Sequence, residues 1–389
     1  MKVAVVCQEC QSQLMLEEAV AQTIEKCPVC GAAIVKSDAA ATQAAPQAQA
    51  ASPVETATDA QATAKEEIVQ EETEKANSPD DFEIVFGVLK KYKGKGGDVE
   101  VPWGVTTIDP KAFFNIRKLN SVTFPETLRS IGEKAFFGCD NLTEIHIPAG
   151  VTSIGVAAFI GSKIEKFTVD PKNKYFKDDG GNLYSKDHSV LVQYAIGKTA
   201  AKVLLAPSVK KIGSYAFFDC RALQTLVMPM VAEIGDEAFY NCMKLANLEK
   251  AHALKIIGKE AFAYCKKLVE FIPSEKLHSI GVRAFEHCVN LEKVFVGSGM
   301  ERIGENAFLD CEALMKVGFA FQTGWSAGGE ALPPTLLRDE KKAAKLLRET
   351  YVGVEWLFAG KQAEKKGEKP AQSMGAFHSG LLDIIDRGL

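Results

Sequence analysis

The sequence predicts a solenoid, a stack of similar coils that takes up most of the 389 residues. Two observations support this prediction. The dipeptide Ala-Phe marks eight positions at nearly constant intervals, apart from one long gap. Each of these dipeptides is followed by a short segment in which apolar and polar residues alternate, as in a half-buried strand. Such a fixed period indicates one structural unit per repeat, whose core is closed only by its stacked neighbours.

The repeating unit is about 23 residues long. Successive anchoring phenylalanines are 23, 23, 58, 22, 23, 23 and 23 residues apart, which predicts about eight coils. The shared pattern is Ile-Gly-x-x-Ala-Phe-x-x-Cys-x-x-Leu, with Asp109 and Ile116 as exceptions in the first unit and Ser162 in the third. The anchors are Phe113, Phe136, Phe159, Phe217, Phe239, Phe262, Phe285 and Phe308.

Each part of the unit has a physical interpretation. In the segment LTEIHIP, alternation predicts a strand with Leu142, Ile145 and Ile147 inward. The glycine is expected to give a tight bend, because glycine adopts backbone angles that other residues avoid. The small alanine admits the large ring beside it. The 58-residue gap holds one repeat and an insertion at about 170–203, which we expect to project as a hairpin after the third coil.

Fragments such as IGEKAFFGCDNLTEIHIP and IGSYAFFDCRALQTLVMP closely resemble the BspA-like leucine-rich repeats of bacterial and protist proteins. The inserted VDPKNKYFKDDGGNLYSKD is similar to a segment typical of that family. So are the segments that begin FGVLKKYKGKGG and GWSAGGEALPP, which would cap the two ends. The resemblance covers roughly residues 82–358. It implies a leucine-rich-repeat solenoid, mostly β with short turns and a helical C-terminal cap, and a family often found at cell surfaces.

The first 36 residues contain two Cys-x-x-Cys pairs separated by 16 residues. This spacing is typical of a structural zinc site. Four thiolates would fill the tetrahedral shell of one zinc ion and leave no position for a reactive water. We therefore expect a zinc ribbon over residues 1–36, with zinc as a structural cofactor bound by Cys7, Cys10, Cys27 and Cys30.

Composition divides the remaining chain. Residues 37–81 contain no aromatic side chain. They hold ten acidic residues against two basic ones, which favours a disordered acidic linker. The solenoid is expected over 82–360. Residues 361–389 form a charged tail that ends in a short apolar segment, which either folds back or docks in a partner's groove.

The sequence favours a cytoplasmic protein without catalytic activity. No apolar run approaches the ~18 residues that cross a bilayer, and the apolar stretch at the N-terminus is shorter than a signal core. Ten cysteines without a signal indicate a reducing compartment. Six of them recur once per coil, which predicts buried, packed thiols rather than nucleophiles. No catalytic motif is present, so no catalytic residue is assigned.

A partner-binding face is expected where the outward strand positions line up across coils. Most of these positions are polar, but three in the C-terminal half are apolar, and an exposed aromatic can anchor an interface. The alternative is that these apolar residues are ordinary surface residues or lie under the C-terminal cap. The candidate residues are Val227, Glu249, Glu270, Ile272, Lys293 and Phe295, with Phe295 as anchor.

The main functional prediction is an intracellular scaffold for protein–protein interactions. The repeat face would bind one partner, and the zinc ribbon would add a second binding module on a flexible tether. A surface or secreted adhesion protein of the BspA-like type is the alternative. A nucleic-acid-associated factor is a further alternative, disfavoured because the ribbon has only Lys2, Lys26 and Lys36 as basic residues.

Overall fold

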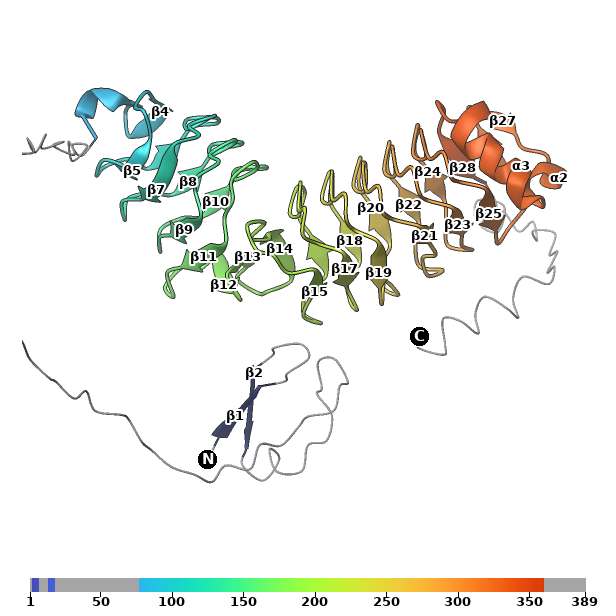
Figure 1. The fold of residues 1–389 in the computed structure, drawn as a ribbon, viewed down its shortest axis with the longest axis horizontal. Coiled ribbons are helices and arrows are strands. Elements are labelled where there is room, and N and C mark those ends of the chain that lie inside the picture. Colours follow the sequence, from blue (N-terminus) through green and yellow to red (C-terminus); the bar gives the residue numbers. More distant parts are fainter. Residues whose placement is uncertain (1, 7–12, 18–76, 360–389) are drawn as a thin grey trace, which may run out of the picture. The chain divides into compact units, whose positions relative to one another are not determined.

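The computed structural model describes residues 2–6, 13–17 and 77–359 (Figure 1). The chain divides into two units, Met1–Lys75 and Ala76–Leu389. In the first unit, β1 (Lys2–Val6) pairs antiparallel with β2 (Gln13–Glu17). The four cysteines of the expected zinc site, the expected acidic linker up to residue 76 and the C-terminal tail lie outside the described residues.

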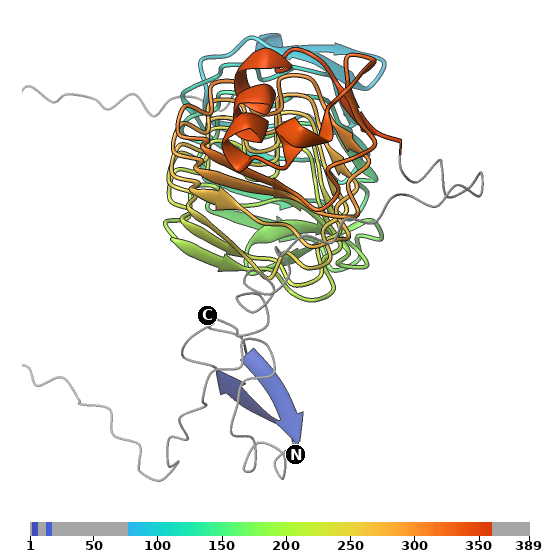
Figure 2. The same cartoon turned by 90° about the vertical axis from the view of Figure 1, so that its right-hand side faces the viewer.

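The second unit is a β-solenoid, as predicted. Its coils follow one another from the N-terminal hairpin to the helical cap (Figure 1), and a view along the stack superimposes them (Figure 2). Two sets of parallel strands run along the stack. The first ladder contains β4 (Val88–Tyr92), β6 (Thr107–Ile108), β8 (Ser130–Ile131), β10 (Ser153–Ile154), β14 (Val190–Gln193), β16 (Lys211–Ile212), β18 (Glu233–Ile234), β20 (Ile256–Ile257), β22 (Ser279–Ile280) and β24 (Arg302–Ile303). The second ladder contains β5 (Gly97–Glu100), β7 (Leu119–Thr123), β9 (Glu144–Ile147), β11 (Lys166–Val169), β15 (Lys202–Leu204), β17 (Thr225–Val227), β19 (Asn247–Glu249), β21 (Glu270–Phe271), β23 (Lys293–Val296) and β25 (Lys316–Phe319).

The solenoid has about ten turns rather than the predicted eight. The two additional turns carry a tyrosine where the others carry the anchoring phenylalanine. The Tyr92 ring stacks on Phe113 at 5.1 Å between centroids, and the Tyr194 ring stacks on Phe217 at 4.6 Å. Counting the Ala-Phe dipeptide alone misses both turns, because tyrosine supplies the same flat apolar ring.

The core of each coil is the anchoring ring and its neighbours. All eight anchoring phenylalanines are buried, and ring pairs in adjacent regular coils stack with centroids 4.8–5.7 Å apart. The strand alternation is confirmed: Leu142, Ile145 and Ile147 are buried, whereas Glu144 and His146 are exposed. Replacing a buried phenylalanine by alanine typically lowers the free energy of unfolding by roughly 3–5 kcal/mol. The rings are therefore the principal links between coils.

The repeat cysteines are buried, as predicted, and they also make a hydrogen bond that the sequence did not indicate. The Cys265 thiol donates to the carbonyl oxygen of Phe239 in the preceding coil at 3.3 Å. Cys139, Cys242, Cys288 and Cys311 do the same to the anchoring phenylalanine one coil earlier, at 3.1–3.3 Å. Each thiol thus fills space and satisfies a buried carbonyl group.

We expect the six solenoid thiols to resist alkylation in the native protein. Burial raises the pKa of Cys139 and Cys311 to about 12 and that of Cys220 to about 11. The thiolate, which is the reactive form, is therefore both inaccessible and scarce at neutral pH. Mass spectrometry after iodoacetamide treatment should find these thiols unmodified without urea and fully modified in urea. Rapid modification of Cys265 in the folded protein would contradict this packing.

The predicted reason for the repeat glycine, a bend with unusual backbone angles, is wrong. None of the glycines of the Ile-Gly steps has a φ in the left-handed region. A Cβ atom at Gly235 would instead lie 2.5 Å from the backbone nitrogen of Ser214, and one at Gly281 would lie 2.5 Å from the carbonyl carbon of Gly258. The position is glycine because neighbouring coils approach too closely for any side chain.

Left-handed backbone angles occur at two other places in each regular coil. One is the residue before the Ala-Phe pair and the other lies two positions after the phenylalanine, as at Glu237 (φ 51°) and Asn241 (φ 61°). Asn, Asp or Gly occupies the second place in six coils, consistent with their tolerance of this conformation. These six residues are Asn115, Gly138, Gly161, Asp219, Asn241 and Asp310.

The insertion is part of the sheet rather than the projecting hairpin that we predicted. β12 (Phe176–Asp179) pairs antiparallel with β13 (Asn182–Ser185), and β13 pairs antiparallel with β14. β14 then pairs in parallel with β16 of the next coil. The inserted strands therefore continue the first ladder, because their backbone groups pair with β14 and not with solvent.

Both ends of the solenoid are capped. At the N-terminal end, the 3-10 turn η1 (Pro79–Asp81) leads into β3 (Phe82–Val85), which forms a hairpin with β4. The predicted helical C-terminal cap is confirmed. It contains β26 (Trp325–Ala327), β27 (Glu330–Ala331), α2 (Pro334–Leu337), α3 (Glu340–Lys345), the π-helical turn η2 (Leu346–Thr350) and β28 (Trp356–Phe358). β28 pairs antiparallel with β24 and so closes the first ladder.

Candidate binding face

The six residues of the predicted face lie on or next to the second ladder, in two separate three-stranded sheets. Val227 and Glu249 are register neighbours in the sheet β15–β17–β19. Glu270 and Lys293 are register neighbours in the sheet β21–β23–β25. The structure thus brings the residues together in pairs, with Phe295 on β23 and Ile272 directly after β21.

Val227 is not an exposed residue, and this part of the predicted face is wrong. Its exposed fraction is 4%. The Lys202 ammonium on β15 lies 3.3 Å from the Glu249 carboxylate on β19, so this ion pair spans the intervening strand β17. Alternation predicted an exposed side chain at this position, but the Val227 side chain is buried. It is a packed residue and not a binding anchor.

Ile272 and Phe295 are half-buried. Phe295 is the register neighbour of Gly318 on β25. Gly318 has no side chain, so this register neighbour places no side-chain atoms beside the Phe295 ring. Glu270 is exposed and Lys293 is half-buried, so charged groups flank the apolar pair. This arrangement suits a contact in which the ring packs and the charges orient the partner.

Two exposed apolar residues of the same sheet were missed by sequence reasoning. Val269 and Met315 are 44% and 49% exposed. They occupy the same place in alternate coils, directly before β21 and β25, and Glu292 lies between them through backbone hydrogen bonds of 2.8 and 3.1 Å. The sequence did contain a signal for these two residues: the equivalent position is polar in other coils, as at Thr143, Glu165 and Gln224. We call Val269, Ile272, Phe295 and Met315 the apolar face.

The most exposed aromatic side chains of the described residues lie elsewhere, at the N-terminal end. Phe86 is 100% and Trp103 is 84% exposed. Phe86 forms the tip of the β3–β4 hairpin, and Trp103 lies in the turn before β6. The Thr106 amide donates to the Gly87 carbonyl oxygen at 2.8 Å, which joins the two segments. Sequence reasoning did not single them out, because neither lies at a repeated strand position.

The described residues show no arrangement suited to metal binding. Across 2–6, 13–17 and 77–359, no three His, Cys, Asp or Glu side chains converge on a common point as metal ligands would. Among the helices described here, none is both long and apolar enough to cross a bilayer.

Comparisons with known proteins agree with the repeat pattern. The family model for the BspA type leucine rich repeat region matches residues 93–180 and 197–315 in six copies, more than half of the chain. The unmatched residues between these ranges include all of β13 and all of β14, where the repeat is interrupted. A comparison with curated protein sequences gives no match.

Two solved structures are similar to the solenoid. A leucine-rich cell surface protein from Faecalibacterium prausnitzii is 30% identical, with a TM-score of 0.53 over 58% of this chain and 60% of that one. The pneumococcal vaccine antigen PcpA is 24% identical, with a TM-score of 0.51 over 57% of this chain and 56% of that one. The chain thus spans less than two thirds of either structure.

Proposed function

Because the chain belongs to the family of BspA-type leucine-rich-repeat proteins, we propose that it is a non-catalytic binding protein whose solenoid presents the apolar face to a protein partner. The family is typically non-enzymatic. The observation that carries the proposal is the gathering of exposed Val269 and Met315 with half-buried Ile272 and Phe295 in one three-stranded sheet. Exposed apolar side chains that gather in one region among charged residues are characteristic of protein interaction sites.

We place this binding at a cell surface rather than in the cytoplasm. Support comes from the Faecalibacterium prausnitzii structure, which is that of a leucine-rich cell surface protein and is 30% identical. Brief protease treatment of intact native cells should cleave the protein if it is displayed outside. Full protection in intact cells, with cleavage after lysis, would contradict surface display and favour an intracellular scaffold.

The apolar face is tested by a double variant, Val269→Asp/Met315→Asp. Both side chains are exposed, so the substitutions should change folding stability by less than about 0.5 kcal/mol each. New charges in the centre of an interface should weaken binding by roughly tenfold or more. The measurement is quantitative capture of a stoichiometric partner from extracts by the immobilised protein.

A matched control exists at two exposed valine and isoleucine positions outside the second ladder. Val156 and Ile256 are 55% and 46% exposed and lie away from the second ladder. The variant Val156→Asp/Ile256→Asp adds the same charge to equally exposed sites and should leave capture unchanged. Equal loss of the partner in both variants, or undiminished capture by the face variant, would disprove the assignment.

A second candidate function rests on the cysteine spacing near the N-terminus. We propose that Cys7, Cys10, Cys27 and Cys30 bind one structural zinc ion, so that residues 1–36 form a second interaction module of an intracellular scaffold. Metal analysis of the purified protein should give one zinc per chain, and Cys7→Ser/Cys10→Ser should lose it. A wild-type content well below one zinc per chain would rule out the site.

A further inference from the structure

Both ladders and the stack of rings are interrupted together at one place in the described residues, between the coils of Phe159 and Tyr194. The second ladder also breaks between β7 and β9 and between β19 and β21, but there the first ladder and the stacked rings continue. In the described residues, no ladder pairing joins β10 to β14 or β11 to β15. The stack of rings also stops at Phe159 and begins again at Tyr194. Strand pairing in both ladders and ring stacking therefore stop at the same point, where a hydrogen bond of 2.8 Å from the Gly197 amide to the Ile164 carbonyl oxygen still joins the two coils.

The buried side chains divide at the same place. One core cluster extends from Leu89 through the insertion to Ala195 of the following coil, and a second runs from Tyr184 to Trp356. Within the insertion, Leu183 packs in the first cluster, whereas the next residue, Tyr184, packs in the second. Neighbouring residues of one strand thus serve two separate cores.

The insertion holds the first half mainly through polar contacts. The buried Asn173 side chain donates to the carbonyl oxygens of Pro148 and Val151 at 2.8 and 3.0 Å. The Phe167 amide donates to the Gly181 carbonyl oxygen at 2.8 Å, which ties β11 to the turn between β12 and β13. These bonds fix the β12–β13 hairpin on the N-terminal half.

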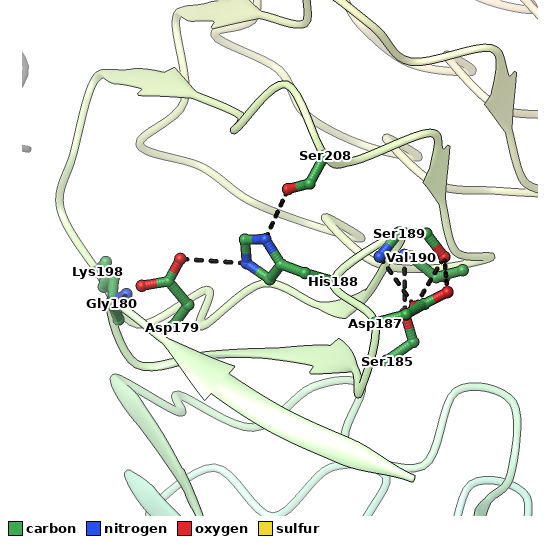
Figure 3. Close-up of polar contacts among 9 residues, drawn as sticks. All are labelled: Asp179, Gly180, Ser185, Asp187, His188, Ser189, Val190, Lys198 and Ser208. Carbon is green, nitrogen blue, oxygen red and sulfur yellow. Dashed lines mark hydrogen bonds and ion pairs between the residues drawn. The ribbon is translucent and has the colours of Figure 1, made fainter. Parts of the chain in front are cut away.

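Besides the β13–β14 pairing, Lys198 and His188 connect that hairpin to the C-terminal half (Figure 3). The Lys198 ammonium donates to the Gly180 carbonyl oxygen and, at 3.0 Å, to the Asn182 side-chain oxygen.

His188 Nε2 lies 3.1 Å from the Asp179 carboxylate at the end of β12, and Nδ1 lies 2.7 Å from the Ser208 hydroxyl oxygen before β16. The His188 ring also contacts Tyr184, with centroids 4.2 Å apart. Burial and the nearby Lys177 lower the pKa of His188, so the neutral ring makes these contacts at neutral pH.

We propose that the insertion is a joint, at which the N-terminal half (82–169) and the C-terminal half (184–358) open as separate cooperative units. In a solenoid, cooperativity comes from contacts between adjacent coils, so a missing set of contacts divides the array. The N-terminal half has four strands of the first ladder against six in the C-terminal half, which also holds the helical cap. The N-terminal half should therefore open first, while the apolar face stays folded.

The test is hydrogen exchange of the full chain, followed by mass spectrometry over a series of low urea concentrations. The most protected amides of the N-terminal half should exchange at least about tenfold faster than those of the C-terminal half. The exchange rates of the two halves should also rise differently with urea concentration. A single rate class and a single urea dependence shared by both halves would overturn the proposal.

A pair of variants tests the role of His188 as a connection. His188→Ala should speed exchange in the N-terminal half by about tenfold, since one or two hydrogen bonds are lost, and leave the C-terminal half unchanged. His287→Ala is the matched control, because His287 also has a left-handed φ and lies 3.4 Å from the Asp310 carboxylate, within the C-terminal half. If both variants change N-terminal exchange equally, His188 does not link the halves.

Discussion

Phe262→Ala is expected to destabilise the C-terminal half of the solenoid by about 3–5 kcal/mol. The Phe262 ring is fully buried between the rings of Phe239 and Phe285, at centroid distances of 5.1 and 5.3 Å. Truncation removes the ring from two coil interfaces at once and leaves a cavity that rigid neighbouring coils cannot fill. Urea unfolding followed by the fluorescence of the buried tryptophans of the cap measures the change in free energy.

Two further substitutions separate the causes of this effect. Phe262→Leu keeps an apolar side chain but loses ring stacking, which contributes about 0.5–1.5 kcal/mol per pair, so its cost should be clearly smaller than that of alanine. Phe86→Ala removes a fully exposed ring and should change stability by less than about 0.5 kcal/mol. If Phe262→Ala costs no more than Phe86→Ala, the stacked rings do not link the coils.

The fold was predictable from the sequence because one physical requirement recurs in every coil. An apolar ring beside a small residue, followed by alternation, identifies inward positions such as Phe239 and Ile145 without knowledge of the neighbours. The same logic failed for Tyr92 and Tyr194, which meet the requirement with a different residue. Counting only turns that carry phenylalanine is stricter than counting every turn that carries an aromatic ring at this position. The stricter count therefore underestimated the number of turns.

The candidate site was less predictable because exposure depends on neighbouring coils. Alternation predicts the direction of a side chain but not which neighbouring atoms cover it, so the burial of Val227 could not be foreseen. Val269 lies just before a strand, where alternation makes no statement. The zinc ligands rest on spacing alone, and their assignment remains a prediction.

Gly281→Ala is expected to destabilise the C-terminal half by about 3 kcal/mol, the upper part of the range for overpacked sites. An added Cβ would lie 2.5 Å from both the carbonyl carbon and the carbonyl oxygen of Gly258 in the preceding coil. These are main-chain atoms and cannot rotate away. The coils would have to separate, which would weaken the 2.9 Å hydrogen bond from the Gly281 amide to the Ile257 carbonyl oxygen.

Gly297→Ala is the matched control, and it should have the opposite sign. Gly297 is buried and, like Gly281, has no left-handed φ, but a Cβ there would meet its nearest atoms at 3.6 Å, an ordinary contact. Replacing such a glycine by alanine restricts the unfolded chain and commonly stabilises by about 0.4–1 kcal/mol. Urea unfolding of both variants separates the two explanations for the repeat glycine. If only Gly281→Ala destabilises the protein, the repeat position is glycine because the coils approach closely. If both variants have equal effects, the position is glycine because of its backbone freedom.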